Sequence, residues 1–128
     1  ISVRIKGVRK PDKTWHLFLP ERNINMSKAK ITEDEFTRFE RLFFKVWHVY
    51  EFGNDKYYSF SDEEIEHLNN TLEQFKQEHP REYDIIIRHY LKRVYYTTIA
   101  REQNVSEGYI RKLCKNGAYY FLKLYDEK

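Results

Sequence analysis

The side chains of this sequence that could do chemistry gather on one short stretch near the C-terminus. Within ten positions, six side chains would share the outward side of a helix: Ser106, Glu107, Tyr109, Arg111, Lys112 and Lys115. Guanidinium and ammonium groups bind phosphate oxygens and the acceptor atoms of base edges, and a serine hydroxyl caps a helix start. Such a surface is typical of a recognition helix in the major groove of DNA.

A second helix and a tight corner must position that helix. An inward apolar seam across both pieces is supplied by Ile99, Ala100, Val105, Ile110 and Leu113. Asn104 stands at the corner, because asparagine tolerates the left-handed conformation that reverses a chain. The small Ala100 allows two helices to approach closely while crossing at roughly 90–120°. These features predict a helix-turn-helix whose recognition helix covers about residues 106–116.

Another helix is predicted directly upstream, opened by Pro80, with an apolar face through Tyr83, Ile86, Ile87 and Tyr90. The whole order resembles region four of bacterial sigma factors, and the phage and mobile-element transcription regulators built on that module. The family pattern is a proline-led helix ending in an apolar-Arg-x-Tyr-like segment, then Ile-Ala, then Val-Ser-x-Gly-x-Ile. Residues 86–90, 99–100 and 105–111 fit it in order, within a resemblance that covers about residues 80–125.

The resemblance implies a DNA-binding transcription regulator. Arg111 and Lys112 would contact base edges or phosphates, Ser106 would lie at the DNA backbone, and Glu107 could accept from a cytosine amino group. The preceding helix would be anchored by Lys92, Arg93, Thr97 and Thr98. Because region four also docks on RNA polymerase, the alternative is a protein-interaction module that uses this C-terminal part or the acidic middle segment.

Three residues depart from the family pattern. Gln103 stands where the family usually has leucine, and Asn104 where it usually has glycine. Gly117 interrupts the recognition helix, since glycine is favoured just past a helix end. We therefore expect the helix to end at Asn116-Gly117 and residues 118–125 to form a separate apolar helix.

The first 79 residues match no family pattern and give the chain a mixed predicted fold class. Residues 2–8 alternate apolar and basic side chains, and 15–19 can pair with them after a turn at 10–13. This predicts a β-hairpin, either an ordinary edge hairpin or a basic wing that contacts DNA. Residues 57–60 could add a strand. We thus expect a mostly α protein with a small N-terminal β-hairpin and a C-terminal helical bundle.

Two helices of residues 1–79 are predicted from capping boxes and apolar stripes. Thr32 with Glu35, and Ser61 with Glu64, have the spacing of a box that satisfies two free backbone donors. The stripes follow at spacings of three and four: Phe36, Phe39, Phe43, Val46 and Tyr50 in the first helix, and Ile65, Leu68, Leu72 and Phe75 in the second. Pro80 ends the second helix and marks the predicted boundary between domains 1–79 and 80–128.

Charge and composition limit the function class. Lys and Arg outnumber Asp and Glu by eight to two in residues 1–30, trail them by five to twelve in 31–79, and lead by ten to six in 80–128. Basic ends suit phosphate contacts. The 22 aromatic residues suit a core or a homodimer interface.

Catalytic and metal-binding patterns are lacking in the sequence. The four glycines form no phosphate loop, the five histidines stand apart, and the single Cys114 is more typical of a helix-face filler than of a nucleophile. We therefore predict no enzyme, metal or cofactor. A chain with one cysteine and no apolar run long enough to span a membrane is expected in the cytoplasm.

Overall fold

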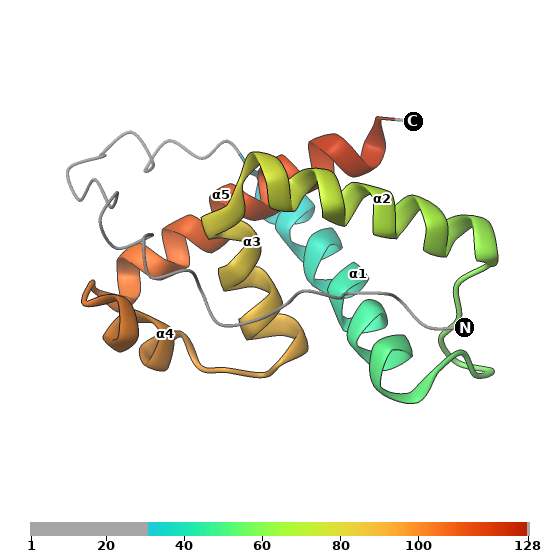
Figure 1. Ribbon diagram of the computed structural model, residues 1–128, viewed down its shortest axis with the longest axis horizontal. Coiled ribbons are helices and arrows are strands. Elements are labelled where there is room, and N and C mark those ends of the chain that lie inside the picture. Colours follow the sequence, from blue (N-terminus) through green and yellow to red (C-terminus); the bar gives the residue numbers. More distant parts are fainter. Residues whose placement is uncertain (1–30, 128) are drawn as a thin grey trace.

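The computed structural model describes residues 31–127, which form helices joined by short connections (Figure 1). In chain order these are α1 (Glu33–Phe52), α2 (Asp62–Glu78), α3 (Pro80–Ile86), the π-helical turn η3 (Ile87–Leu91), α4 (Tyr96–Gln103) and α5 (Glu107–Asp126). Helix α5 is the axis of this arrangement and contacts the other four α-helices. Figure 1 shows α4 at its N-terminal end and α2 beside its C-terminal half. No helix within this range has both the length and the apolar character of a membrane span.

Both predicted capping boxes are present at the starts of α1 and α2. The Thr32 hydroxyl accepts the Glu35 backbone N–H at 3.1 Å, and the Glu35 carboxylate accepts the Thr32 N–H at 2.9 Å. Ser61 and Glu64 make the same exchange at 3.1 and 2.8 Å. Each box satisfies two backbone donors that the helix itself leaves unpaired, which fixes where the helix begins.

The predicted apolar stripes meet in one core around the ring of Phe121 in α5. That ring lies 6.0 Å from Phe39, 5.1 Å from Phe43 and 5.7 Å from Phe75, measured between centroids. The three partners come from α1 and α2, and all four rings are fully buried. A single hydrophobic cluster therefore crosses residue 80, and the proposed division into two domains there stays a prediction.

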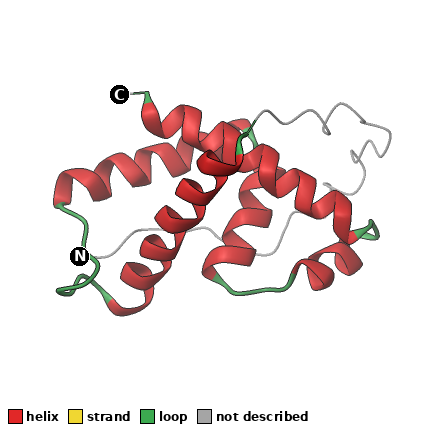
Figure 2. Cartoon of the chain, turned by 180° about the vertical axis from the view of Figure 1, so that it is seen from behind, coloured by secondary structure: helices red, strands yellow, loops and turns green. Residues whose placement is uncertain are grey.

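The mixed fold class is wrong for the part of the chain that the structure describes, because residues 31–127 contain helices and loops only (Figure 2). Residues 57–60 do not form a strand. The side chain of Asn54 accepts the Phe60 N–H at 3.0 Å and donates to its carbonyl at 3.1 Å. The Asn54 amide thus makes the two backbone hydrogen bonds that a neighbouring strand would otherwise make. The predicted hairpin of residues 2–19 lies outside the described residues.

The expected end of the recognition helix at Gly117 is also wrong, because α5 continues unbroken to Asp126. Gly117 is buried where α5 crosses α3. A Cβ added there would lie 2.8 Å from the Glu82 Cβ and 2.8 Å from the Ile86 Cδ1. The glycine therefore serves close helix approach, since it allows two backbones to pass where any side chain would collide.

Helix α3 ends in a wider turn that re-aims the chain. It begins at Pro80, as predicted, and is followed directly by the π-turn η3, at whose end the Lys92 N–H bonds the Ile87 carbonyl at 3.1 Å. Arg93 then takes a positive φ of 61°. These two features carry the loop between η3 and α4 away from the core, toward the side of α1.

Replacement of Gly117 by alanine tests the close approach. Gly117→Ala should lower the free energy of unfolding by about 1–3 kcal/mol, because the Glu82 Cβ cannot yield without moving α3. Gly108→Ala in the same helix is the matched control, since an added Cβ there meets only the Ser106 Oγ at 3.9 Å. The free energy of unfolding of the control should rise by up to about 1 kcal/mol. Equilibrium urea unfolding measures both, and equal effects would contradict the steric account.

Candidate nucleic-acid interface

The corner between α4 and α5 is left-handed at Asn104, as predicted. Asn104 has φ 60° and ψ 43°, and the following Val105 N–H bonds the Ala100 carbonyl at 3.0 Å. The Ser106 hydroxyl then accepts the Tyr109 N–H at 3.1 Å and caps α5. Behind the corner, the buried seam consists of Ile99, Ala100, Ile110 and Leu113. The corner therefore fixes how α5 leaves α4 and which side of α5 is free.

The free side of the first half of α5 is cationic. Arg111, Lys112 and Lys115 are exposed there and lie on one side of the helix, at spacings of one, three and four residues. We call these three residues the cationic face. Lys115 reaches toward the start of α1, with its Nζ 5.6 Å from the centre of the Phe36 ring.

Arg111 already has partners on the protein surface. Its guanidinium donates to the Glu107 carboxylate at 2.9 and 2.5 Å, and its Cζ lies 4.6 Å from the centre of the Tyr96 ring. An exposed pair at this spacing contributes roughly 0.3–0.5 kcal/mol. A phosphate or a guanine edge offers a stronger bidentate partner. The guanidinium is thus positioned over α4 but can exchange Glu107 for a ligand.

Four other predicted contact residues fall into two groups, one on α4 and one on the loop before it. Thr97 is exposed and Thr98 half-buried in the first turn of α4, next to the Tyr96 ring that Arg111 covers. Lys92 and Arg93 point instead to α1, where the Lys92 Nζ lies 3.4 Å from the Tyr50 hydroxyl and the Arg93 Cζ 4.8 Å from the centre of the Trp47 ring. The structure therefore brings the α4 and α5 residues together and places the loop residues apart.

Tyr109 also lies away from the cationic face, in a polar contact that the sequence did not reveal. The buried Gln103 side chain accepts two hydrogen bonds from Arg81 of α3, at 3.0 and 3.3 Å. The same guanidinium lies 5.1 Å from the centre of the Tyr109 ring. Gln103 thus anchors the end of α4 by hydrogen bonding, where the family pattern has an apolar leucine. In the sequence, a glutamine at an apolar position of the pattern was the one sign of a polar contact. No feature of the sequence identified Arg81, 22 residues away, as its partner.

A second polar link joins α3 and η3 to α4. Arg88 forms an ion pair with Glu102 at 2.7 Å and lies 4.0 Å from the buried carboxylate of Asp84. Burial raises the pKa of Asp84 to about 6, and the opposing attraction of Arg88 is too weak to cancel this effect. Asp84 therefore destabilises the fold when it ionises.

Cys114 lies beneath the interface in a buried contact with two tyrosines. The Tyr96 hydroxyl donates to its Sγ at 3.4 Å, and the Tyr90 hydroxyl, 4.0 Å from the same sulfur, donates to Glu40 at 2.8 Å. Burial raises the pKa of the Cys114 thiol to about 11, so the group stays protonated. The cysteine fills space and holds Tyr96 under Arg111.

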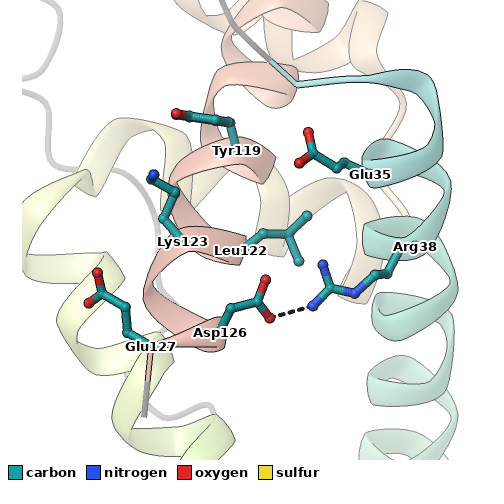
Figure 3. Close-up of a pocket in the computed structure, with 7 residues that line it drawn as sticks. All are labelled: Glu35, Arg38, Tyr119, Leu122, Lys123, Asp126 and Glu127. Atoms are coloured by element: carbon teal, nitrogen blue, oxygen red, sulfur yellow. Dashed lines mark hydrogen bonds and ion pairs between the residues drawn. The ribbon is translucent and has the colours of Figure 1, made fainter.

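A hollow of about 260 Å³ lies at the other end of α5, against the start of α1 (Figure 3). An ion pair between Arg38 and Asp126 joins its two walls, and Lys123 lies over the Tyr119 ring. Charges of both signs line this hollow. Its groups tie the C-terminal turn of α5 to α1 and present no single-signed surface to a polyanion.

The Asp84 carboxyl gives a pH dependence whose sign follows from its pKa. The folded value of about 6 lies above the usual 3.8, so the folded state holds the proton more tightly and its stability falls as pH rises through that window. The free energy of unfolding of Asp84→Asn, relative to that of wild type, should rise by about 2 kcal/mol between about pH 4.5 and about pH 7. Denaturant unfolding at the two pH values measures this difference.

Asp55→Asn is the control, because backbone hydrogen bonds from Tyr58 and Tyr57 lower the pKa of Asp55 below its usual 3.8. Because these hydrogen bonds stabilise the ionised carboxylate in the folded state, Asp55→Asn should destabilise the fold at both pH values, which is the opposite sign to Asp84→Asn. A pH-independent effect of Asp84→Asn would contradict the burial of an ionising carboxylate.

Comparisons with models of known protein families, with curated protein sequences and with solved structures found no match to this chain. The resemblance to region four of sigma factors therefore rests on the residues quoted for it and stays a prediction.

Proposed function

We propose that the chain is a sequence-specific DNA-binding transcription regulator of the phage or mobile-element type, with the first half of α5 in the major groove. One observation carries the proposal. The cationic face is exposed directly after a left-handed corner, while the opposite side of the same turns is filled by fully buried Ile110 and Leu113. A protruding helix with one cationic side and one anchored side is the form that enters a major groove.

The start of α5 suits a phosphate of the DNA backbone. The first N–H groups of a helix lack intrahelical partners and carry partial positive charge. Gly108 lies exposed in this first turn, with no side chain between its backbone and an approaching phosphate. Arg111 and Lys112 then follow one turn further along, within reach of base edges or of the adjoining phosphates.

Charge beyond the helix supports a polyanionic partner. A shallow hollow of about 280 Å³ is lined by Lys115 from α5 and by Ile31 at the start of the described residues. The sequence that precedes Ile31 carries eight Lys and Arg against two Asp and Glu. Ile31 thus lies near Lys115 of the cationic face, and the basic charge that precedes it in the sequence would add to nonspecific DNA affinity.

A second candidate function is a protein-interaction module that docks on RNA polymerase or another regulator. It is favoured by α2, whose exposed side is acidic at Asp62, Glu63, Glu66 and Glu73. The two functions respond differently to charge reversal on α2. Duplex binding should weaken by about 0.9 in the logarithm of the binding constant per phosphate contact and decade of salt and should not be lost in Glu66→Lys, whereas docking through the acidic side of α2 should be lost in that variant.

Arg111→Ala tests the recognition assignment. On a duplex selected from a random pool by wild-type protein, the variant should lose about 1–3 kcal/mol of discrimination against a scrambled duplex. Lys123→Ala is the matched control, because Lys123 is an exposed cation at the far end of the same helix. Fluorescence anisotropy at fixed salt measures the six affinities of the three proteins for the two duplexes. Unchanged discrimination in Arg111→Ala would contradict a base contact, and unchanged affinity for both duplexes would remove Arg111 from the interface.

Glu107→Gln separates repulsion from recognition at the same site. The loss of one negative charge should strengthen binding to scrambled duplex a few-fold, because Glu107 repels phosphate and occupies Arg111. If Glu107 also accepts from a cytosine amino group, discrimination should fall by about 1–3 kcal/mol at one base pair. Titration of wild type and variant against single-base variants of the selected duplex measures both effects. Weaker binding to scrambled duplex would contradict the repulsive role.

A further inference from the structure

A fixed aromatic surface lies at the C-terminal end of α1, away from the cationic face. Its members are Phe44, Trp47, His48, Phe52 and Tyr58, which we call the aromatic platform. Each ring lies within 4.7–6.2 Å of at least one other member, measured between centroids. Phe44 is 44% exposed and Phe52 66% exposed, so two large apolar rings of this cluster face solvent.

The platform is held in place by its own backbone. Gly53 ends α1 with φ +81°, which turns the chain back over the helix. The Asp55 carboxylate then accepts hydrogen bonds from the backbone N–H groups of Tyr57 and Tyr58 at 2.9 and 2.8 Å. The Asn54 side chain bonds both the N–H and the carbonyl of Phe60. These contacts stiffen the loop. The rings are therefore presented without a large loss of conformational freedom on binding.

Cations are interleaved with the rings. The Arg93 guanidinium lies over Trp47 at 4.8 Å, and the Lys45 Nζ lies 4.3 Å from the ring centre of Phe60, the last residue of the loop. Arg41 precedes Phe44 and Lys45 by one helical turn and is exposed on the same side of α1. Counting residues 41–59 with the 92–95 loop, five Lys and Arg stand against two Asp and Glu.

This charge decides between the possible occupants. A second copy of the chain would bring the same positive surface against itself, which is unfavourable. Duplex DNA buries the faces of its bases and offers little to an exposed phenyl ring. A single strand offers both unstacked bases for the rings and phosphates for the cations. We propose that the aromatic platform is a binding site for single-stranded nucleic acid, separate from the duplex-binding face of α5.

The experiment uses the full chain and a fluorescein-labelled oligothymidylate of about 12 nucleotides, a length within the usual range for single-strand sites. Phe52→Ala should weaken binding by between about fivefold and a hundredfold, which is the usual effect of removing one stacking ring. Phe52→Leu should weaken it similarly, because leucine keeps apolar area but has no π-face. Both substitutions fall at a solvent-exposed position, and a circular dichroism spectrum verifies the fold.

Two controls keep the platform distinct from the rest of the surface. Tyr119→Ala removes a ring that also carries a lysine, Lys123, but lies near the other end of α1 (Figure 3). Arg111→Ala removes the main proposed duplex contact. Tyr119→Ala should bind the oligothymidylate as wild type does, and Arg111→Ala should lose less affinity for it than Phe52→Ala does. If Arg111→Ala left duplex discrimination unchanged, the proposed role of α5 would fail, and the proposal for the aromatic platform would stand.

Three results would overturn the proposal. The first is undetectable binding of the oligothymidylate to wild type at low salt. The second is wild-type affinity in Phe52→Leu, which would mean that apolar area and not stacking is recognised. The third is a wild-type dimer in light scattering that Phe52→Ala makes monomeric without a change in strand affinity, which would make the platform a protein interface.

Discussion

Helices α3 and α5 pass each other at a separation that only glycine permits, and the rest of the molecule is arranged around that crossing. With Gly117 against Glu82 and Ile86, α5 runs on unbroken past α3 and carries Phe121 into the centre of the core. One helix therefore does two tasks. Its second half is buried among α1, α2 and α3, and its first half packs on α4 with further contacts to Arg81 of α3 and to Phe36 of α1.

Polar groups fix the orientation of α4, which has little buried apolar area of its own. The helix has eight residues, too few to be stable alone, and only Ile99 and Ala100 are its buried apolar side chains. Arg81 with Gln103, and Arg88 with Glu102, tie it to α3 and η3. Partly buried ionic contacts of this kind add little net stability, because desolvation offsets attraction. They do restrict α4 to one orientation, and with it the corner that aims α5.

Local patterns in the sequence predicted the helices well, because each pattern is fixed by residues only a few positions apart. The capping boxes, the stripes of α1 and α2, the proline start of α3 and the corner at Asn104 are all of this kind. The errors concern contacts between distant residues. Gly117 resembles a helix end until α3 is known to cross there. Residues 57–60 resemble a short strand until Asn54 and Asp55 are known to take their backbone hydrogen bonds.

The candidate interface shows the same division. The exposure of Arg111, Lys112 and Lys115 follows from helical periodicity once the seam is assigned. The contacts beneath Arg111 do not follow from periodicity, since the Tyr96 ring is held there by a stacked His89 ring at 3.7 Å and by a hydrogen bond to Cys114. Nor could spacing place Lys92 and Arg93 on α1, because a π-turn and a positive φ intervene and neither has a reliable sequence signal.

The unbroken path of α5 also gives the molecule a mechanical property. From Gly117, where α5 crosses α3, the helix rises roughly 9 Å to Arg111 at 1.5 Å per residue. A tilt of about 10° at the crossing would displace that guanidinium by roughly 1.5 Å, half the length of a hydrogen bond. A small change in the angle at which α5 crosses α3 would thus move Arg111, because α5 is one unbroken helix.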